Sequence, residues 1–308
     1  MSEITASLVK QLREQTGAGM MACKRALTEM GGDIEKAIDW LRKKGLAAAA
    51  KKAGRVASEG LIAVVQDSSV GALVEVNAET DFVARNDEFQ NFARSVANLA
   101  VSVNGDLDRL KKSKFSTDGI TVAEQLIAMV GRIGENLVLR RSCTLSVKKG
   151  VVASYIHNSV GKGLGKIGVL VGLESTGDPK NLDELGRKIA MHVCAARPEA
   201  IDRDSLDPSS LQRERDVLIE QAKTSGKPAE IIEKMVNGRL RKYYEEVVLG
   251  EQIYVIDGEN KVNRVIELAS KEINVPIRIS GFKRFELGEG IEKREEDFAA
   301  EVAAQVEN

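Results

Sequence analysis

The chain has 308 residues, with 45 lysines and arginines against 46 aspartates and glutamates, and this balance disfavours direct nucleic-acid binding. Aromatic residues make up only 4% of the sequence, which argues against platforms for base stacking. No run approaches the roughly 20 apolar residues that a membrane span needs, and the first ten residues lack the apolar core of a signal peptide, so we expect a cytoplasmic protein of about two domains without membrane association.

Three short amphipathic helices are predicted in the first 45 residues. Apolar side chains recur at helical spacing, and glycines interrupt the pattern after each segment. Trp40 is the largest core candidate of the third helix, whereas Met20 and Met21 open the second helix and could belong to the core or to the surface. The alanine-rich stretch at 45–59 then favours a helical linker. The three segments are 4–15, 20–30 and 33–45.

From residue 60 the sequence contains a weak internal repeat, in which each unit reads strand, strand, helix and, later, a further strand. Strands in pairs followed by helices predict an α+β fold. The short turn at 67–69 predicts that the first two strands form an antiparallel hairpin. The matching segments are 60–63 with 150–153, 72–76 with 167–171, 89–97 with 182–190, and the later strands 137–147 with 275–287.

The connection between the second strand and the first long helix reads Ala-Glu-Thr-Asp-Phe-Val-Ala-Arg-Asn-Asp over residues 78–87. Such connections lie on the surface, so Asp81 and Phe82 could bind a partner. Alternatively, Asp81 caps the helix and Phe82 packs beneath it. The second unit has Ser-Thr-Gly-Asp at 175–178 where the first has Thr-Asp-Phe-Val, and the absence of the Asp-Phe pair there favours a functional role.

A glycine-rich loop at 158–166 separates the first two strands of the second unit. Residues 163–168 match Gly-x-Gly-x-x-Gly, but they lead into a strand, whereas a dinucleotide site needs a helix N-terminus to hold the phosphates. The phosphate-loop pattern also fails, because Val160 stands where the first glycine belongs and Ile167 where a Ser or Thr belongs. We therefore predict that the chain itself binds no nucleotide.

Two charged segments, 208–224 and 229–246, carry apolar residues at helical spacing and are joined by a turn containing Pro228, which predicts an αα-hairpin. A terminal amphipathic helix is predicted for 297–306, with Phe298 on its apolar side.

The cysteines and histidines predict neither a metal site nor a disulfide framework. The three cysteines are widely spaced, and no Cys and His stand at zinc-binding spacing. We therefore expect no cofactor and predict that the cysteines behave as small buried hydrophobic residues. The cysteines are Cys23, Cys143 and Cys194, and the histidines are His157 and His192.

Three stretches in chain order, 11–24, 80–86 and 281–293, resemble signatures of the bacterial elongation factor Ts family. The members of that family are guanine nucleotide exchange factors, not enzymes, and they act on the GTPase elongation factor Tu. The resemblance implies a three-helix bundle like a ubiquitin-associated (UBA) domain, then a duplicated α+β core with an inserted antiparallel coiled-coil hairpin and a C-terminal helix. The implied boundaries are 1–54 for the UBA-like domain with its linker, 55–148 for the core N-subdomain, 149–287 for the core C-subdomain with the hairpin at about 197–246, and 288–308 for the C-terminal module.

The resemblance also implies roles for individual residues. Those that would dislocate Mg²⁺ from the partner GTPase are Thr80, Asp81, Phe82 and Val83. Those that would contact the partner are Met20, Met21, Arg85, Asn86, His157, Ile291 and Phe298. His157 could equally be a hydrogen-bonded residue at a sheet edge.

Two other functions and a homodimer stay open from the sequence. The chain could be a UBA-type adaptor whose core is only a scaffold, without exchange activity. It could also be a small-molecule enzyme using Asp81, Arg85 and His157, but these residues do not provide a paired acid and base at a usable spacing. The αα-hairpin could pair with a second copy of the chain.

Overall fold

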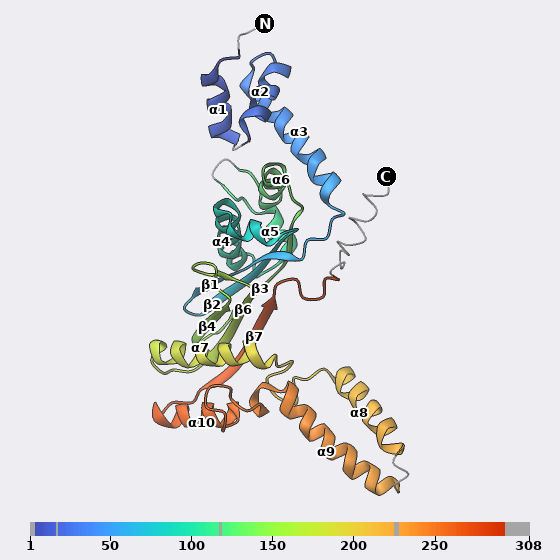
Figure 1. The fold of residues 1–308 in the computed structure, drawn as a ribbon. Helices are drawn as coiled ribbons and strands as arrows, with labels where there is room; N and C mark the ends of the chain where they lie inside the picture. Colours follow the sequence, from blue (N-terminus) through green and yellow to red (C-terminus); the bar gives the residue numbers. More distant parts are fainter. Residues whose placement is uncertain (1–3, 17, 117–118, 225–227, 293–308) are drawn as a thin grey trace.

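The computed structural model describes residues 4–16, 18–116, 119–224 and 228–292 (Figure 1). The chain combines helices with two antiparallel sheets, so the fold is α+β, as predicted. The N-terminal helices lie at one end of the molecule, the sheets in the middle, and helices α8 (Pro208–Lys223) and α9 (Ala229–Val247) at the other end. Within these described ranges no helix combines the length and apolarity that crossing a membrane requires.

The first three helices, α1 (Ala6–Thr16), α2 (Met20–Glu29) and α3 (Ile34–Lys52), pack into a small bundle with its own core. Trp40, the largest core candidate of the third helix, is only partly buried and packs against this core. The fully buried members are Leu12, Cys23, Ala26, Leu27 and Ala37.

The prediction that the third helix ends at Gly45 is wrong, because α3 continues to Lys52. Helix α3 passes close to helix α6 (Val122–Ile133) at this point, and a side chain at Gly131 would lie 3.6 Å from the Gly45 Cα. The two glycines allow the helices to approach closely, and the alanines that follow favour the helical state. The linker predicted for 45–59 is therefore helical only as far as Lys52.

The first unit is a sheet of three long strands covered by helices (Figure 1). Strands β1 (Glu59–Asp67), β2 (Val70–Ala78) and β3 (Leu137–Ser146) pair antiparallel with β2 in the middle, and β1 and β2 form the predicted hairpin. The buried face of helix α4 (Asp87–Ser102) packs on β1 and β2. Helix α5 (Leu107–Lys112) and helix α6, which the sequence analysis did not predict, extend the same core.

The second unit repeats this order of strands. Strands β4 (Gly150–His157), β6 (Ile167–Glu174) and β7 (Arg278–Glu286) form an antiparallel sheet with β6 in the middle. Helix α7 (Pro179–Ala196) packs on β4 and β6, and helix α10 (Val262–Glu272), also not predicted, contributes to the same core.

Two glycines at the start of the units show how closely the repeat holds. Gly60 has φ 124° and Gly150 has φ 140°, a conformation that favours glycine. A Cβ at Gly60 would lie 2.2 Å from the Val76 carbonyl oxygen, and one at Gly150 would lie 1.9 Å from the Leu173 oxygen. Both units require a glycine at this position, because the backbone of the neighbouring strand lies too close to it for a side chain.

The strand pairing corrects the predicted alignment of the two units. Gly60 pairs with Asn77, and Gly150 pairs with Glu174. On its other side, the middle strand of each sheet has a register shift at the equivalent place, between Glu75 and Val76 in β2 and between Gly172 and Leu173 in β6. The predicted matching of 80–83 with 175–178 is therefore shifted by two positions. In the corrected register Asp81 corresponds to Asp178 and Phe82 to Pro179.

The glycine-rich loop leads into a strand, as predicted, and it also contributes a short strand of its own. Strand β5 (Leu164–Gly165) pairs antiparallel with β1 of the first unit, with Ile62 opposite Gly165. The second unit therefore completes the sheet of the first. Apolar side chains between the two sheets join the units further, and the fully buried ones are Leu73, Val147, Val152 and Leu170.

Helices α8 and α9 lie side by side away from the sheets (Figure 1). A small core of Leu218, Ala222 and Val236 lies between them. Pro228 directly precedes α9, where its fixed φ of −59° suits the start of a helix. The rest of the predicted turn, 225–227, lies outside the described residues.

Candidate partner-binding surface

A short 3-10 turn, η1 (Asp81–Arg85), connects β2 to α4. The Phe82 side chain is 75% exposed, and Asp81 and Arg85 are also exposed, so the interpretation that Phe82 packs beneath its helix is wrong. Val83 and Ala84 are buried in the core of the first unit. The turn thus has a buried half that anchors it and an exposed half that presents an aromatic ring beside a carboxylate.

Asp81 does not cap α4. The residue that caps α4 is Asn86, whose side-chain oxygen accepts a hydrogen bond from the Phe89 amide at 3.1 Å. Asn86 is exposed, so its predicted contact with a partner is compatible with this structural role. Asp178, the counterpart of Asp81, does cap its helix, accepting hydrogen bonds from the amides of Lys180 and Asn181.

Thr80 is held by a residue far along the chain. Its amide and hydroxyl donate to the two oxygens of Glu135, at 2.9 and 2.6 Å. Glu79 accepts a hydrogen bond from the Asn136 amide, and Asn136 in turn donates to the Arg55 carbonyl oxygen at 2.7 Å. These partners of Thr80 were not predicted, because no local pattern signals a contact across 55 residues.

Met20 and Met21 begin helix α2, and their side chains are 62% and 77% exposed. The interpretation that they are core residues is therefore wrong. Arg132 of helix α6 fixes the neighbouring end of α1 by donating to the Thr16 carbonyl oxygen at 3.2 Å. The same guanidinium pairs with Glu88 in the first turn of α4, so one arginine ties the N-terminal bundle to the helix that follows the η1 turn.

His157 is exposed at the end of β4, and its Nδ1 lies 3.1 Å from the Tyr155 hydroxyl. Both interpretations of this histidine, as a hydrogen-bonded edge residue and as a partner contact, are compatible with this position. In the described part of the chain no hydrogen bond or ion pair joins His157 to Asp81 or Arg85. Within that part of the chain, the three residues proposed for an enzyme site thus form no hydrogen-bonded group.

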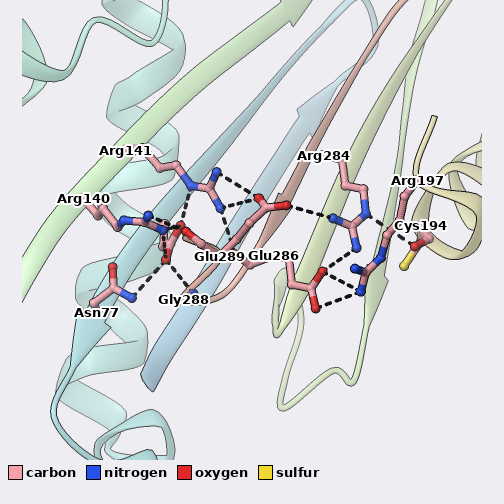
Figure 2. A network of polar contacts seen from close by, with 10 residues as sticks. Asn77, Arg140, Arg141, Cys194, Arg197, Arg284, Glu286, Gly288 and Glu289 are labelled. Atoms are coloured by element: carbon pink, nitrogen blue, oxygen red, sulfur yellow. Dashed lines mark hydrogen bonds and ion pairs between the residues drawn. The ribbon is translucent and has the colours of Figure 1, made fainter. Parts of the chain in front are cut away.

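The segment that follows β7 is fixed to the first sheet by a network of charges (Figure 2). At its centre is Glu75, a carboxylate with no exposed surface that pairs with Arg140 and Arg141 of β3. It also accepts hydrogen bonds from the amide of Gly288 at 2.9 Å and from Asn77 at 3.0 Å. Since Gly288 follows β7, this network sets where the chain leaves the core.

Arg141 reaches beyond Glu75 to the same segment, donating to Glu289 at 3.2 Å and to the Glu286 carbonyl oxygen at 2.8 Å (Figure 2). Ile291, which follows, is partly buried beside a shallow groove formed by residues 53–57 and strand β3. Phe298 lies outside the described residues. The predicted C-terminal module thus starts from a point that is fixed on the core.

The cysteines form no cluster. Cys23 and Cys194 are buried and Cys143 is partly buried, and all three are free thiols. Burial raises the pKa of Cys143 to about 11 and also raises the pKa of Cys194, so both stay protonated and unreactive near neutral pH.

The fold and the surface define a class of protein: a duplicated α+β core that presents exposed apolar and charged side chains on several modules. Comparison with known proteins then assigns the family. The family model described as Elongation factor TS matches residues 79–289, more than half of the chain. The chain belongs to the elongation factor Ts family of translation elongation factors.

Several curated relatives are similar over nearly the whole length. Elongation factor Ts of Rhodospirillum rubrum is 63% identical over 307 residues, with 99% of both chains covered. The proteins of the same name from Rhodospirillum centenum and Paramagnetospirillum magneticum are 61% and 60% identical, and each alignment covers 99% of this chain and at least 98% of the relative.

Proposed function

We propose that this chain is a guanine nucleotide exchange factor that binds elongation factor Tu with GDP, displaces Mg²⁺ and promotes exchange of GDP for GTP during cytoplasmic protein synthesis. Membership of the elongation factor Ts family supports the partner. The observation that carries the mechanism is the exposed Phe82 on a turn fixed at both ends. The chain acts on the partner's nucleotide and metal and is not itself an enzyme.

The physical requirement for such a factor is differential affinity. A GTPase holds GDP through backbone amides, a lysine and a Mg²⁺ ion that bridges phosphate oxygens. A factor that binds the nucleotide-free state more tightly than the GDP state must weaken GDP binding by the same ratio. GTP, when it binds, weakens the hold of the factor in the same way, and the factor is released.

Phe82 and Asp81 supply this difference at the metal site. Phe82 is exposed in the free protein, and burying its ring between elements of the partner is worth roughly 1.5–3 kcal/mol. Asp81 brings a negative charge beside it, which rearranges the surroundings of the Mg²⁺ ion. Thr80 and Val83 support these two residues: Thr80 fixes the start of the turn through Glu135, and Val83 anchors the turn in the core.

One ring cannot release both the phosphates and the base, so other modules must anchor it. The UBA-like domain, 1–54, would bind the partner through Met20 and Met21, which are exposed. Arg85 and Asn86 would add contacts beside the wedge, on the core N-subdomain, 55–148.

The second half of the chain would supply the remaining contacts. His157 lies on the core C-subdomain, 149–287, and Ile291 and Phe298 belong to the C-terminal module, 288–308. The hairpin within about 197–246, observed as α8 and α9, would be an antiparallel coiled coil that could also join two copies of the chain.

Release of labelled GDP from elongation factor Tu tests this function. The chain should accelerate release, and Phe82→Ala should slow the accelerated rate by about 10- to 150-fold, the factor that corresponds to burying one phenylalanine. Met191→Ala is the matched control, since it removes an exposed apolar side chain from α7 of the second unit and should leave the rate unchanged.

Two outcomes would contradict the proposal. If the wild-type chain binds the partner without accelerating GDP release, the chain is an adaptor of the UBA type. If release is accelerated equally by Phe82→Ala, the exchange function stands and the wedge mechanism does not.

A further inference from the structure

The η1 turn is held by two carboxylates that act reciprocally. Glu135 accepts hydrogen bonds from the amide and hydroxyl of Thr80, the residue after Glu79. Glu79 accepts a hydrogen bond from the amide of Asn136, the residue after Glu135. We call these four residues, Glu79, Thr80, Glu135 and Asn136, the clasp. It joins the end of β2 to the start of β3 directly in front of the exposed Phe82.

The clasp is backed by the segment that leaves the N-terminal bundle. Asn136 is only 6% exposed, and its side-chain amide donates to the Arg55 carbonyl oxygen at 2.7 Å. The Arg55 guanidinium also forms an ion pair with the Glu79 carboxylate, with 3.4 Å between the nitrogen and the oxygen. Three segments that are distant in the sequence therefore meet behind one turn, which leaves its entry little freedom to move.

A second Thr-Glu pair in the same protein shows what is unusual here. Thr121 also donates its amide and hydroxyl to a carboxylate, that of Glu124, at 2.9 and 3.0 Å. Those partners are three residues apart and form a local capping box at the start of α6. Thr80 and Glu135 are 55 residues apart, and η1 has no side-chain cap, so their contact fixes one element on another.

We infer that Glu135 is a positioning residue for nucleotide exchange: through the clasp it holds the η1 turn so that Phe82 is already presented in the conformation that inserts into the partner. This inference rests on the proposed exchange function. Thr80 fixes the turn before Asp81 and Phe82 in the sequence, and the buried Val83 and Ala84 fix it after them. Asp81 and Phe82, between these anchors, are exposed. A turn fixed before binding loses little conformational entropy on binding.

A double-mutant cycle tests the inference. Glu135→Ala should slow the maximal rate of GDP release from elongation factor Tu about tenfold, which equals about 1.4 kcal/mol and is the scale of ordering one residue of backbone. In the Phe82→Ala background the same substitution should slow release less than about twofold, because there is no longer a ring to position. The half-saturating concentration of the chain should change much less than the maximal rate.

Matched variants separate positioning from a general loss of stability. Thr80→Val keeps the shape and the amide donor but removes the hydroxyl donor, so it should have a smaller effect in the same direction, and it serves if Glu135→Ala does not fold. Glu135→Gln keeps one accepting oxygen and should restore part of the rate. Asp106→Ala removes the helix cap of α5, should lower the melting temperature and should leave the release rate unchanged.

The outcomes distinguish this inference from the function on which it rests. Equal effects of Glu135→Ala with and without Phe82 would overturn the clasp's role while leaving the exchange function intact. An unchanged release rate in both Glu135→Ala and Thr80→Val would do the same. If the wild-type chain did not accelerate GDP release at all, the proposed function and the clasp inference would both fail.

Discussion

The connections between the second strand and the long helix differ between the two units, although the strands before them are in the same register. In the second unit the connection is residues 175–178, and Asp178 caps α7, which begins at the next residue. In the first unit the connection is 79–86, and Asn86 takes the capping role. The inserted η1 turn therefore moves the cap downstream and frees Asp81 and Phe82 from any structural duty in the helix.

The contacts that hold the two connections also differ. In the second unit Gly177 packs against Ile273, and a Cβ there would lie 2.7 Å from the Ile273 Cδ1. In the first unit Thr80 occupies the corresponding position and is bound by Glu135. Apolar packing closes one connection, whereas a directed polar contact holds the other in a turn that leaves Phe82 exposed.

A second difference lies at the irregularity in the middle strand. The first unit has Glu75 there, paired with Arg140 and Arg141, and the second has Gly172 opposite Gly281. A Cβ at Gly172 would lie 2.6 Å from the Ser280 Oγ and 3.0 Å from the Val147 Cγ1, so a side chain at this point would require its neighbours to shift. In the first unit, by contrast, Glu75 forms the charge network that fixes residues 286–289.

Removing that network should give the largest loss of stability. Glu75→Ala should lower the free energy of unfolding by about 3 kcal/mol, because it leaves two partly buried arginines without their shared carboxylate. Urea unfolding measures the change. Glu184→Ala, which removes an exposed carboxylate of α7 paired with Lys188, should leave the free energy of unfolding nearly unchanged. Equal losses in the two variants would show that Glu75 is not a structural centre.

The next effect is a pH dependence confined to the second unit, since the first contains no histidine. His192 is fully buried, accepts a hydrogen bond from the Val255 amide at its Nδ1, and lies 2.9 Å from Gln252 through its Nε2. Burial lowers the pKa of His192 below its usual 6.5. As the pH falls below about 6.5, the unfolded chain therefore takes up a proton before the folded chain does, and stability is lost.

The expected slope is up to about 1.4 kcal/mol per pH unit, with full stability above about pH 7. Urea unfolding between about pH 5.5 and pH 7.5 measures it. His192→Gln should remove the slope in this range whatever it does to the absolute stability. A slope that persists in this variant would assign the dependence to another group.

The smallest effect should come from the two helix caps. Asn86→Ala and Asp178→Ala should each lower the free energy of unfolding by about 1 kcal/mol, because each leaves amides at a helix start without an acceptor. Only Asn86→Ala should also slow GDP release, since it loosens the end of the η1 turn. Asn86→Asp keeps the capping oxygen, so it should restore both stability and rate. Restored stability with a slow rate would instead indicate that the Asn86 amide contacts the partner.

The sequence predicted much of the fold because the signals involved are local. Helical spacing, glycine interruptions and paired strands identified the duplicated α+β core and the hairpin of β1 and β2. The same approach failed at Gly45, where close packing against α6 lets the helix continue. The predicted alignment of the units was also shifted by two positions. The first two strands are joined by a short turn in the first unit and by the long loop 158–166 in the second, so residue spacing does not fix which positions correspond.

For the candidate site, the sequence by itself determined which residues stand on the β2–α4 connection and that a family signature runs through them. Only the tertiary structure decided that Phe82 is exposed while Val83 is buried, and that Asn86 rather than Asp81 is the cap. The partners that decide this lie far along the chain, 55 residues from Thr80 to Glu135 and 213 from Glu75 to Gly288. Hydrogen bonds and burial between such residues depend on how the strands pair in space, and a linear pattern carries no record of that pairing.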